Sequence, residues 1–106
     1  MTELDAQFAT LARDLEMLIA LLDEADDRFW RPWFERGLTQ VRAHRLGGAT
    51  YILGCYGGED TFSDHALRAD LATSDPLRHR NLNARLTLLR DRVFDAANAI
   101  TARRAW

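Results

Sequence analysis

The chain has 106 residues, 47% of them hydrophobic, and a formal net charge of −2. This length suits one domain, residues 1–106, with a core large enough to fold without disulfides or a structural metal. Nucleic-acid binding calls for a basic patch with interleaved aromatic residues and a positive total charge. The arginine-rich C-terminal helix is the only candidate for such a patch, and the overall acidity counts against it, so we expect no nucleic-acid partner.

Three features of the sequence bear on its location. The N-terminal segment lacks the basic start and long apolar run of a signal peptide. Its longest apolar run, residues 17–22, is far shorter than the roughly 20 residues that span a bilayer. Cys55 is the single cysteine, which is typical of a reducing compartment. We therefore expect a soluble, cytoplasmic protein that does not bind a membrane.

The charges are distributed unevenly along the chain. Residues 1–27 carry a net charge of −7 and residues 76–106 carry +5, and every basic residue is an arginine. Two explanations are open. Either the two ends lie side by side and offset each other within one chain, or one of them faces a charged partner.

Residues 2–25 have the pattern of an amphipathic helix. Their apolar residues recur at steps of three and four and so share one helical face: Leu4, Phe8, Leu11, Leu15, Leu18 and Leu22. Two aspartates at residues 26–27 end the pattern.

A second helix is expected from about Pro32 to Arg45, because proline is tolerated in the first turn of a helix. Gly47 and Gly48 are expected to close it. The segment 49–53 that follows is partly β-branched, so a helical turn and a brief strand both remain open, with the short distance to the next glycines favouring the turn.

The C-terminal half of the chain contains two further start signals. Thr61 or Ser63 is expected to cap a helix over residues 64–72, with an acidic residue in its first turn. Residues 74–76, Ser-Asp-Pro, are expected to start a long final helix that ends near residue 103. The prediction is an all-α, single-domain helical bundle with two long terminal helices and a short irregular middle.

The segment 53–65, LGCYGGEDTFSDH, is the most chemically diverse part of the chain. A phosphate-binding loop is excluded, because it needs a lysine after its glycines and acids stand there instead. Cys55 would need a nearby base to act as a nucleophile, and the spacing places none of His44, His65 and His79 beside it.

A metal site in this segment is also considered. Glu59, Asp60, Asp64 and His65 have the composition of a metal cluster, but Asp64 and His65 are adjacent and point apart on a helix. We therefore assign no catalytic residue, no metal and no cofactor. The least implausible catalytic set is Cys55, Tyr56, Asp64 and His65.

A structural account of the segment fits better. Two glycines permit a sharp turn, Phe62 is expected to anchor the loop in the core, and Ser63 or Asp64 to cap the next helix. A rigid polar loop is also a good recognition surface. The candidate binding residues are Tyr56, Gly57, Gly58, Asp60, Thr61, Phe62, Ser63 and Asp64. Possible interface anchors are Trp30, Trp33 and Trp106, since tryptophan is enriched at binding hot spots, although the first two are also suited to filling the core.

Three segments of the chain together resemble a family of small bacterial helical proteins. They are the tryptophan-rich second helix with Trp30 and Trp33, the stretch YGGEDTFSD over residues 56–64, and NARLTLLRDRVFDAA over residues 83–97. The resemblance implies a common helical fold and no established activity. Some such small proteins serve as immunity partners of secreted toxins.

Three functions follow as hypotheses. The first is a protein-binding module, most concretely an immunity or antitoxin-type protein that blocks a toxin by occlusion. The second is a homo-oligomeric structural protein, in which the acidic helix of one chain meets the basic helix of another. The third is an enzyme that uses the segment between Cys55 and His65.

Overall fold

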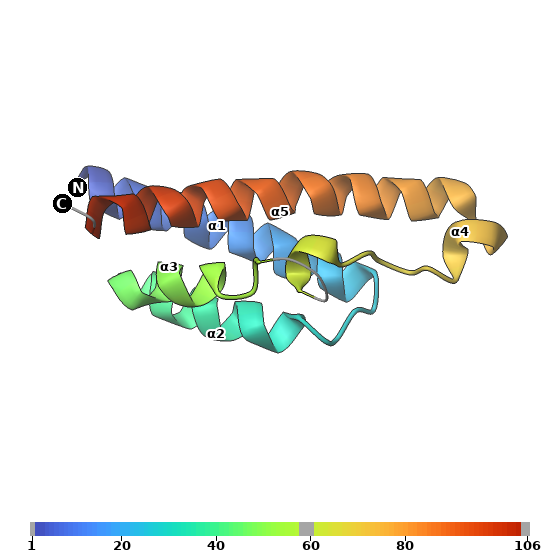
Figure 1. Ribbon diagram of the computed structural model, residues 1–106, viewed down its shortest axis with the longest axis horizontal. Helices are drawn as coiled ribbons and strands as arrows, with labels where there is room; N and C mark the ends of the chain where they lie inside the picture. The colour runs from blue at the N-terminus through green and yellow to red at the C-terminus, as the bar shows by residue number, and fades with distance from the viewer. Residues whose placement is uncertain (1, 58–60, 105–106) are drawn as a thin grey trace.

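The computed structural model describes residues 2–57 and 61–104, with the side chain of residue 104 left aside. These residues form an all-α, single-domain bundle, as predicted (Figure 1). Its elements are α1 (Glu3–Glu24), α2 (Arg31–Arg42), α3 (Leu46–Leu53), a single 3-10 turn (Phe62–Asp64), α4 (Leu71–Ser74) and α5 (Pro76–Arg104).

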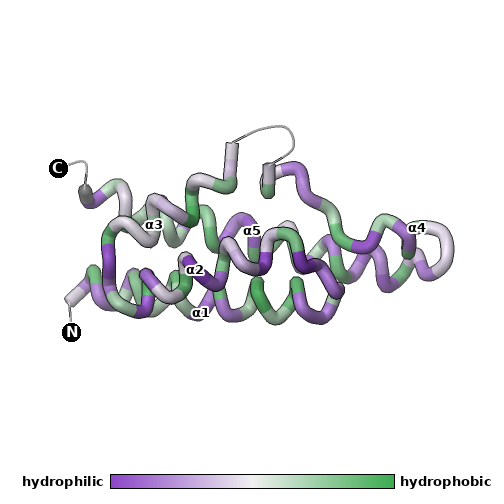
Figure 2. The backbone as a smooth tube through the Cα atoms, turned by 90° about the horizontal axis from the view of Figure 1, so that it is seen from below, coloured by the Kyte–Doolittle hydropathy of each residue, from purple (hydrophilic) through white to green (hydrophobic). Residues whose placement is uncertain are grey.

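The two long terminal helices form one layer and two shorter helices form the other. α1 and α5 lie side by side and run in opposite directions, and α2 and α3 cover one side of them (Figure 1). α5 has 29 residues and is thus about 43 Å long, close to the 49 Å longest extent of the molecule. The short α4 lies at the end of the bundle farthest from the chain termini (Figure 2).

The apolar repeats of α1 and α5 supply most of the core. Apolar and polar residues alternate around α1, as the changing colours along its tube show (Figure 2). The α1 residues of the predicted face are buried except for the half-buried Leu4. From α5 the core receives Leu82, Leu86, Leu89, Val93, Ala97 and Ile100. Each buried leucine contributes roughly 1.5–3 kcal/mol, so these two faces account for the pairing of the terminal helices.

The acidic and basic segments of the chain offset each other. Arg103 Nη2 lies 2.7 Å from Glu3 Oε2, and Arg85 Nη2 lies 3.2 Å from Glu24 Oε1. Hydrogen bonding by the Arg85 guanidinium lowers the pKa of the Glu24 carboxyl. These pairs are exposed to solvent, which screens them, so they set the charge balance more than the stability.

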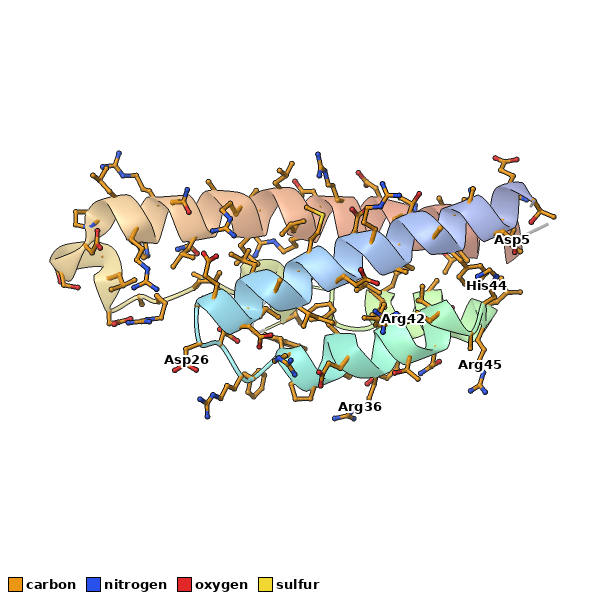
Figure 3. All side chains as sticks on the ribbon, turned by 180° about the vertical axis from the view of Figure 1, so that it is seen from behind. Asp5, Asp26, Arg36, Arg42, His44 and Arg45 are labelled. Carbon is orange, nitrogen blue, oxygen red and sulfur yellow. The ribbon has the colours of Figure 1, made fainter. Side chains whose placement is uncertain are left out.

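The connection between α2 and α3 differs from the prediction. α2 ends at Arg42, before the expected boundary, and the glycines at 47 and 48 lie inside α3 rather than closing α2. The turn is made by His44, which has a φ of +54°. Its Nδ1 lies 3.0 Å from Asp5 Oδ1 and its ring stacks on Phe8, so contacts with α1 hold this unusual conformation (Figure 3).

The glycines of this region allow α2 and α3 to approach closely. A Cβ atom on Gly48 would lie 2.9 Å from Gln40 Cβ and 3.2 Å from the backbone nitrogen of Val41. A Cβ atom on Gly47 would have no heavy atom within 4 Å.

This contrast predicts opposite effects for two neighbouring substitutions. Gly48→Ala is expected to lower the free energy of unfolding by about 1–3 kcal/mol, because the added methyl group overpacks the contact with α2. Gly47→Ala is expected to raise it by up to about 1 kcal/mol through helix propensity alone. Urea unfolding of both variants measures the difference, and equal effects would show that α2 and α3 do not meet at Gly48.

The predicted helix over residues 64–72 is wrong. In its place stand the 3-10 turn, an irregular stretch in which Arg68 has a φ of +49°, and the four-residue α4. Backbone groups of His65 and Leu67 in this stretch bond to side chains of α5. The predicted start of α5 is confirmed: Pro76 is its first residue, and Asp75 Oδ1 accepts a hydrogen bond from the backbone nitrogen of Arg78 at 3.2 Å. Within the described ranges, no helix combines the length and the apolar character needed to cross a membrane.

Candidate functional site

The candidate site is a corner where the loop between α1 and α2 meets the segment around the 3-10 turn. Phe62 lies at its centre and is fully buried. Its ring makes edge contacts with Phe34 at 4.7 Å between centroids, and with Trp30 and Tyr56 at 5.8 Å each. These contacts confirm that Phe62 anchors the loop in the core.

The loop is closed by hydrogen bonds at its base. The backbone nitrogen of Phe62 donates to the carbonyl of Cys55 at 2.9 Å, and that of Gly57 to Ser63 Oγ at 3.3 Å. Gly57 has a φ of +155°, which side chains other than hydrogen disfavour. The Thr61 hydroxyl accepts from the backbone nitrogen of Ser63, so Thr61 caps the turn. Asp64 is exposed at the end of the turn and does not cap a following helix, which corrects the expected role of its carboxylate.

Asn83 and Arg90 of α5 form hydrogen bonds with the backbone of the corner. Arg90 Nη1 donates to the carbonyl oxygens of His65 at 2.9 Å and Phe62 at 3.3 Å, while the Tyr56 hydroxyl donates to the carbonyl of Arg90 at 2.9 Å. Asn83 Oδ1 accepts from the backbone nitrogen of Leu67 at 2.8 Å, and its Nδ2 donates to the carbonyl of Leu67 at 3.0 Å. The segment is thus fixed to α5 at three successive points.

A largely buried pair joins the corner to the loop after α1. His65 Nε2 lies 2.5 Å from Asp27 Oδ2, and the two side chains are only 22% and 14% exposed. The His65 ring also stacks on Phe62, with 6.1 Å between centroids. Across the described part of the chain, the buried second oxygen of Asp27 has no hydrogen-bond partner. The pair links segments 38 residues apart and orients the histidine ring.

An open hollow of about 270 Å³ lies on the outer side of this corner. It is lined by Phe29, Trp30, Thr61, Asp64, His65 and Ala66. Phe29 is 79% exposed, whereas its neighbour Trp30 is half-buried and in edge contact with it. The exposed ring of Phe29 and the exposed carboxylate of Asp64 thus line the same hollow. The backbone beneath them is held by side chains of α5.

The predicted site residues lie in different places in the structure. Trp30, Thr61 and Asp64 line the hollow. Tyr56, Phe62 and Trp33 face the interior, where Trp33 stacks on Tyr51 with 4.3 Å between ring centroids. Gly58, Asp60 and Trp106 lie outside the described residues. Gly57 and Ser63 shape the loop.

Sequence reasoning missed four residues of the site. Phe29 adjoins an apolar helical face in the sequence, and Asp27 stands where the apolar repeat of the first helix ends, so neither residue is marked as part of a site. Asn83 and Arg90 directly follow the buried α5 residues Leu82 and Leu89, and nothing in their spacing indicates which backbone groups they reach. The one available signal was the mixture of Asn and Arg beside an apolar repeat.

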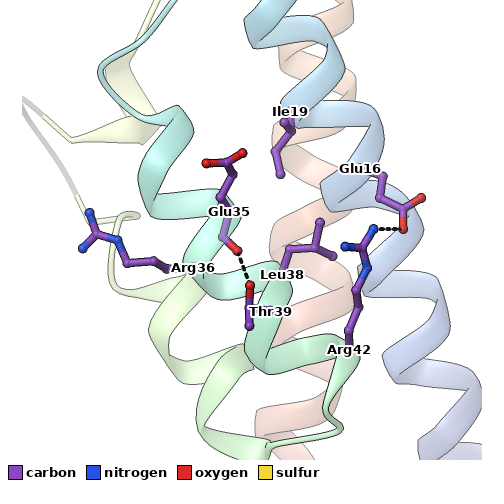
Figure 4. Close-up of a pocket in the computed structure, with 7 residues that line it drawn as sticks. All are labelled: Glu16, Ile19, Glu35, Arg36, Leu38, Thr39 and Arg42. Atoms are coloured by element: carbon purple, nitrogen blue, oxygen red, sulfur yellow. Dashed lines mark hydrogen bonds and ion pairs between the residues drawn. The ribbon is translucent and has the colours of Figure 1, made fainter.

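A larger groove of about 450 Å³ lies between α1 and α2 (Figure 4). Arg42 Nη2 lies 2.8 Å from Glu16 Oε1 across it, and the Thr39 hydroxyl donates to the carbonyl of Glu35. Arg36 points away from the bundle (Figure 3). These polar groups are paired with each other or directed to solvent, so the groove offers no convergent set of reactive side chains.

Cys55 is buried rather than poised for reaction. It is 2% exposed, and its Sγ donates to the carbonyl of Ile52 at 3.2 Å. Burial raises the pKa of the thiol to about 12, the opposite of what a nucleophilic cysteine needs. His65 is engaged with Asp27 and His44 with Asp5. In the portion of the chain that the structure describes, no three potential ligands form a metal cluster, and Glu59 and Asp60 lie outside it.

The buried thiol has two measurable consequences. Alkylation of native Cys55 at pH 8 is expected to be limited by opening of the fold, so adding urea should accelerate it steeply. Because the folded pKa lies above that of the unfolded thiol, the unfolded state loses its proton first as pH rises, and stability falls between about pH 9 and pH 12. A Cys55→Ala variant should lose less stability over this range, and a thiol that reacts in the native protein as fast as a free cysteine contradicts the burial.

The comparisons with known proteins give no relative. No protein-family model, no curated protein and no solved structure matches the chain. The resemblance of the tryptophan-rich helix and the Tyr-Gly-Gly segment to small bacterial helical proteins therefore stays a prediction.

Proposed function

We propose that the chain is a cytoplasmic protein-binding module, an immunity or antitoxin-type protein that neutralises a bacterial toxin by occlusion, and that the corner is its contact surface. The observation that carries this proposal is the exposure of Phe29 at the edge of the hollow. A large aromatic side chain that stays 79% exposed beside a half-buried tryptophan is typical of an interface anchor.

The rigidity of the corner supports the proposal. The hydrogen bonds from Asn83 and Arg90 and the pair between Asp27 and His65 hold the backbone on both sides of Phe29 and Asp64. A prearranged surface loses little conformational entropy when a partner binds, and more of the contact energy remains as affinity. Occlusion needs such a surface and needs no catalytic group.

The charge of the surface favours a particular kind of partner. Asp64 is exposed, and among the described residues its carboxylate forms no ion pair. Asp26 lies on the same loop as Phe29 and is 67% exposed in its pair with Arg28. Because Arg28 offsets Asp26, the surface suits a partner with an apolar pocket for Phe29 and a basic group opposite Asp64.

The test is binding by variants that leave the fold intact. A Phe29→Ser, Asp64→Ala double variant changes only exposed side chains, so its melting temperature should match that of the unaltered protein. Leu77→Ser serves as the matched control, because it removes an apolar side chain that is 74% exposed in the first turn of α5. Loss of a stoichiometric protein partner in the double variant alone supports the proposal, and retention of the partner by all three proteins overturns it.

The enzyme hypothesis has weaker support from these contacts. Burial raises the pKa of the Cys55 thiol, so the thiol is not an activated nucleophile. The His65 ring is paired with Asp27 rather than with Cys55. The homo-oligomer hypothesis concerns a different surface, the groove between α1 and α5.

A further inference from the structure

The outward side of α1 and α5 carries a second apolar surface, separate from the corner at Phe29. A groove of about 290 Å³ runs between the two helices and is lined by Met17, Ala20, Leu21, Glu24, Arg85, Leu88 and Leu89. Leu21 and Leu89 form its buried floor, whereas Met17 and Leu88 stand at its edges with 44% and 51% of their surface exposed. Neither of the helices α2 and α3 covers this side, because both lie on the opposite side of the layer (Figure 1).

Small and uncharged residues extend this surface along both helices. A second hollow, of about 200 Å³, lies nearer the chain termini and is lined by Glu3, Ala6, Gln7, Thr10, Ala96 and Ala99. Both hollows lie between α1 and α5. In α1 the exposed positions at helical spacing on this side are Ala6, Thr10, Arg13, Met17 and Ala20, and in α5 they are Ala84, Leu88, Asp91, Asp95 and Ala99. Of these ten positions, four are alanine and three are charged.

Two of the remaining charges on this side, one on α1 and one on α5, are opposite in sign and lie at the same height, and among the described residues Asp91 is a further unpaired acid on α5. The pairs Glu3–Arg103 and Glu24–Arg85 show the antiparallel register of α1 and α5, and this register places Arg13 level with Asp95. Of the ion pairs between described residues, none includes Arg13 or Asp95. One helix thus carries an uncompensated positive charge and the other an uncompensated negative charge at the same height.

We propose that this surface is a homodimer interface in which α1 of each copy lies across α5 of the other. A two-fold axis parallel to the helices keeps every residue at its own height and sets α1 antiparallel to the second α5. Arg13 then meets Asp95 of the other copy, twice by symmetry, and Leu88 enters the groove edged by Met17 beside Ala20. A two-fold axis across the helices instead sets α1 on α1 and forms neither of these ion pairs.

The occupant is a second copy because the surface is complementary to itself. This side of one chain carries both the groove and Leu88, which fills the groove of the other copy. It also carries both Arg13 and Asp95, which form the ion pairs between the two copies. The small residues Ala6, Ala20, Ala84 and Ala99 let two helical layers approach closely. The interface is separate from the corner at Phe29, so the dimer leaves that surface open.

Sedimentation velocity of the full chain tests the proposal. At tens of micromolar, the sedimenting species of the unaltered protein is expected to have twice the 12.1 kDa mass of one chain. The Leu88→Glu variant is expected to have the mass of one chain and an unchanged helical content. Leu77→Glu is the matched control: Leu77 is 74% exposed on the same helix but lies beyond the end of α1, so this variant should remain a dimer.

Charge reversal separates the proposed arrangement from nonspecific association. Arg13→Asp and Asp95→Arg are each expected to weaken dimerisation about tenfold or more, because each creates two like-charge contacts. The double reversal restores opposite charges and should restore the dimer. A single-chain mass for the unaltered protein, a dimer that survives Leu88→Glu, or a double reversal no better than the single ones overturns the proposal.

Discussion

Replacing Phe62 with alanine is expected to lower the free energy of unfolding by about 3–5 kcal/mol. The ring is fully buried and touches Trp30 and Phe34 at the start of α2 and Tyr56 after α3. Truncation removes these contacts and leaves a cavity that the braced loop cannot close. Chemical unfolding measures the loss.

The control for this effect is Phe29→Ala. Its ring is 79% exposed, so the change in stability should stay within about 0.5 kcal/mol. The two phenylalanines thus separate the structural part of the corner from its exposed part. A similar small loss for both variants would show that Phe62 does not hold the loop in the core.

Replacing Asn83 with leucine is expected to lower the free energy of unfolding by about 2–3 kcal/mol. The substitution keeps the approximate size of the side chain but leaves the backbone nitrogen and carbonyl of Leu67 without their partners at 2.8 and 3.0 Å. Leu67 is itself fully buried, so water does not readily replace the lost bonds.

Hydrogen exchange locates the effect of this change. The amide of Leu67 should exchange much faster in the Asn83→Leu variant, whereas amides in the middle of α1 should change only in proportion to global stability. Asn98→Leu, at an exposed position of the same helix, should leave both stability and exchange nearly unchanged. Unchanged exchange at Leu67 would contradict the role of Asn83 as a clamp.

The long helices could be predicted because their signal is local. Apolar residues at steps of three and four run through α1 and α5, and most of the residues in these repeats are buried. The charge asymmetry left two explanations open, and the pairs Glu3–Arg103 and Glu24–Arg85 show that the two segments offset each other within one chain.

The middle of the chain could not be predicted, because its conformation depends on distant contacts. Gly47 and Gly48 have the sequence pattern of a helix end, yet Gly48 is needed for the approach of α2. The segment after Thr61 has a capping residue and an acid, yet side chains from α5, 16 to 28 residues away, bind its backbone and prevent a regular helix.

The candidate site was predicted only in part for the same reason. An apolar residue within a polar loop is a strong local signal, and it identified Phe62 as an anchor. The pairing of Asp27 with His65 spans 38 residues, and the exposure of Phe29 results from how two loops meet. Neither leaves a periodic trace in the sequence.

The most direct test of the proposed binding surface is quantitative capture from a lysate of the native cell, with the unaltered protein, the Phe29→Ser, Asp64→Ala variant and the Leu77→Ser control compared at equal folded concentration. We predict one protein partner in stoichiometric amount with the unaltered protein and with Leu77→Ser, and its loss with the double variant. Equal capture by all three proteins, or no partner retained by the unaltered one, would contradict the account of the corner as a recognition surface.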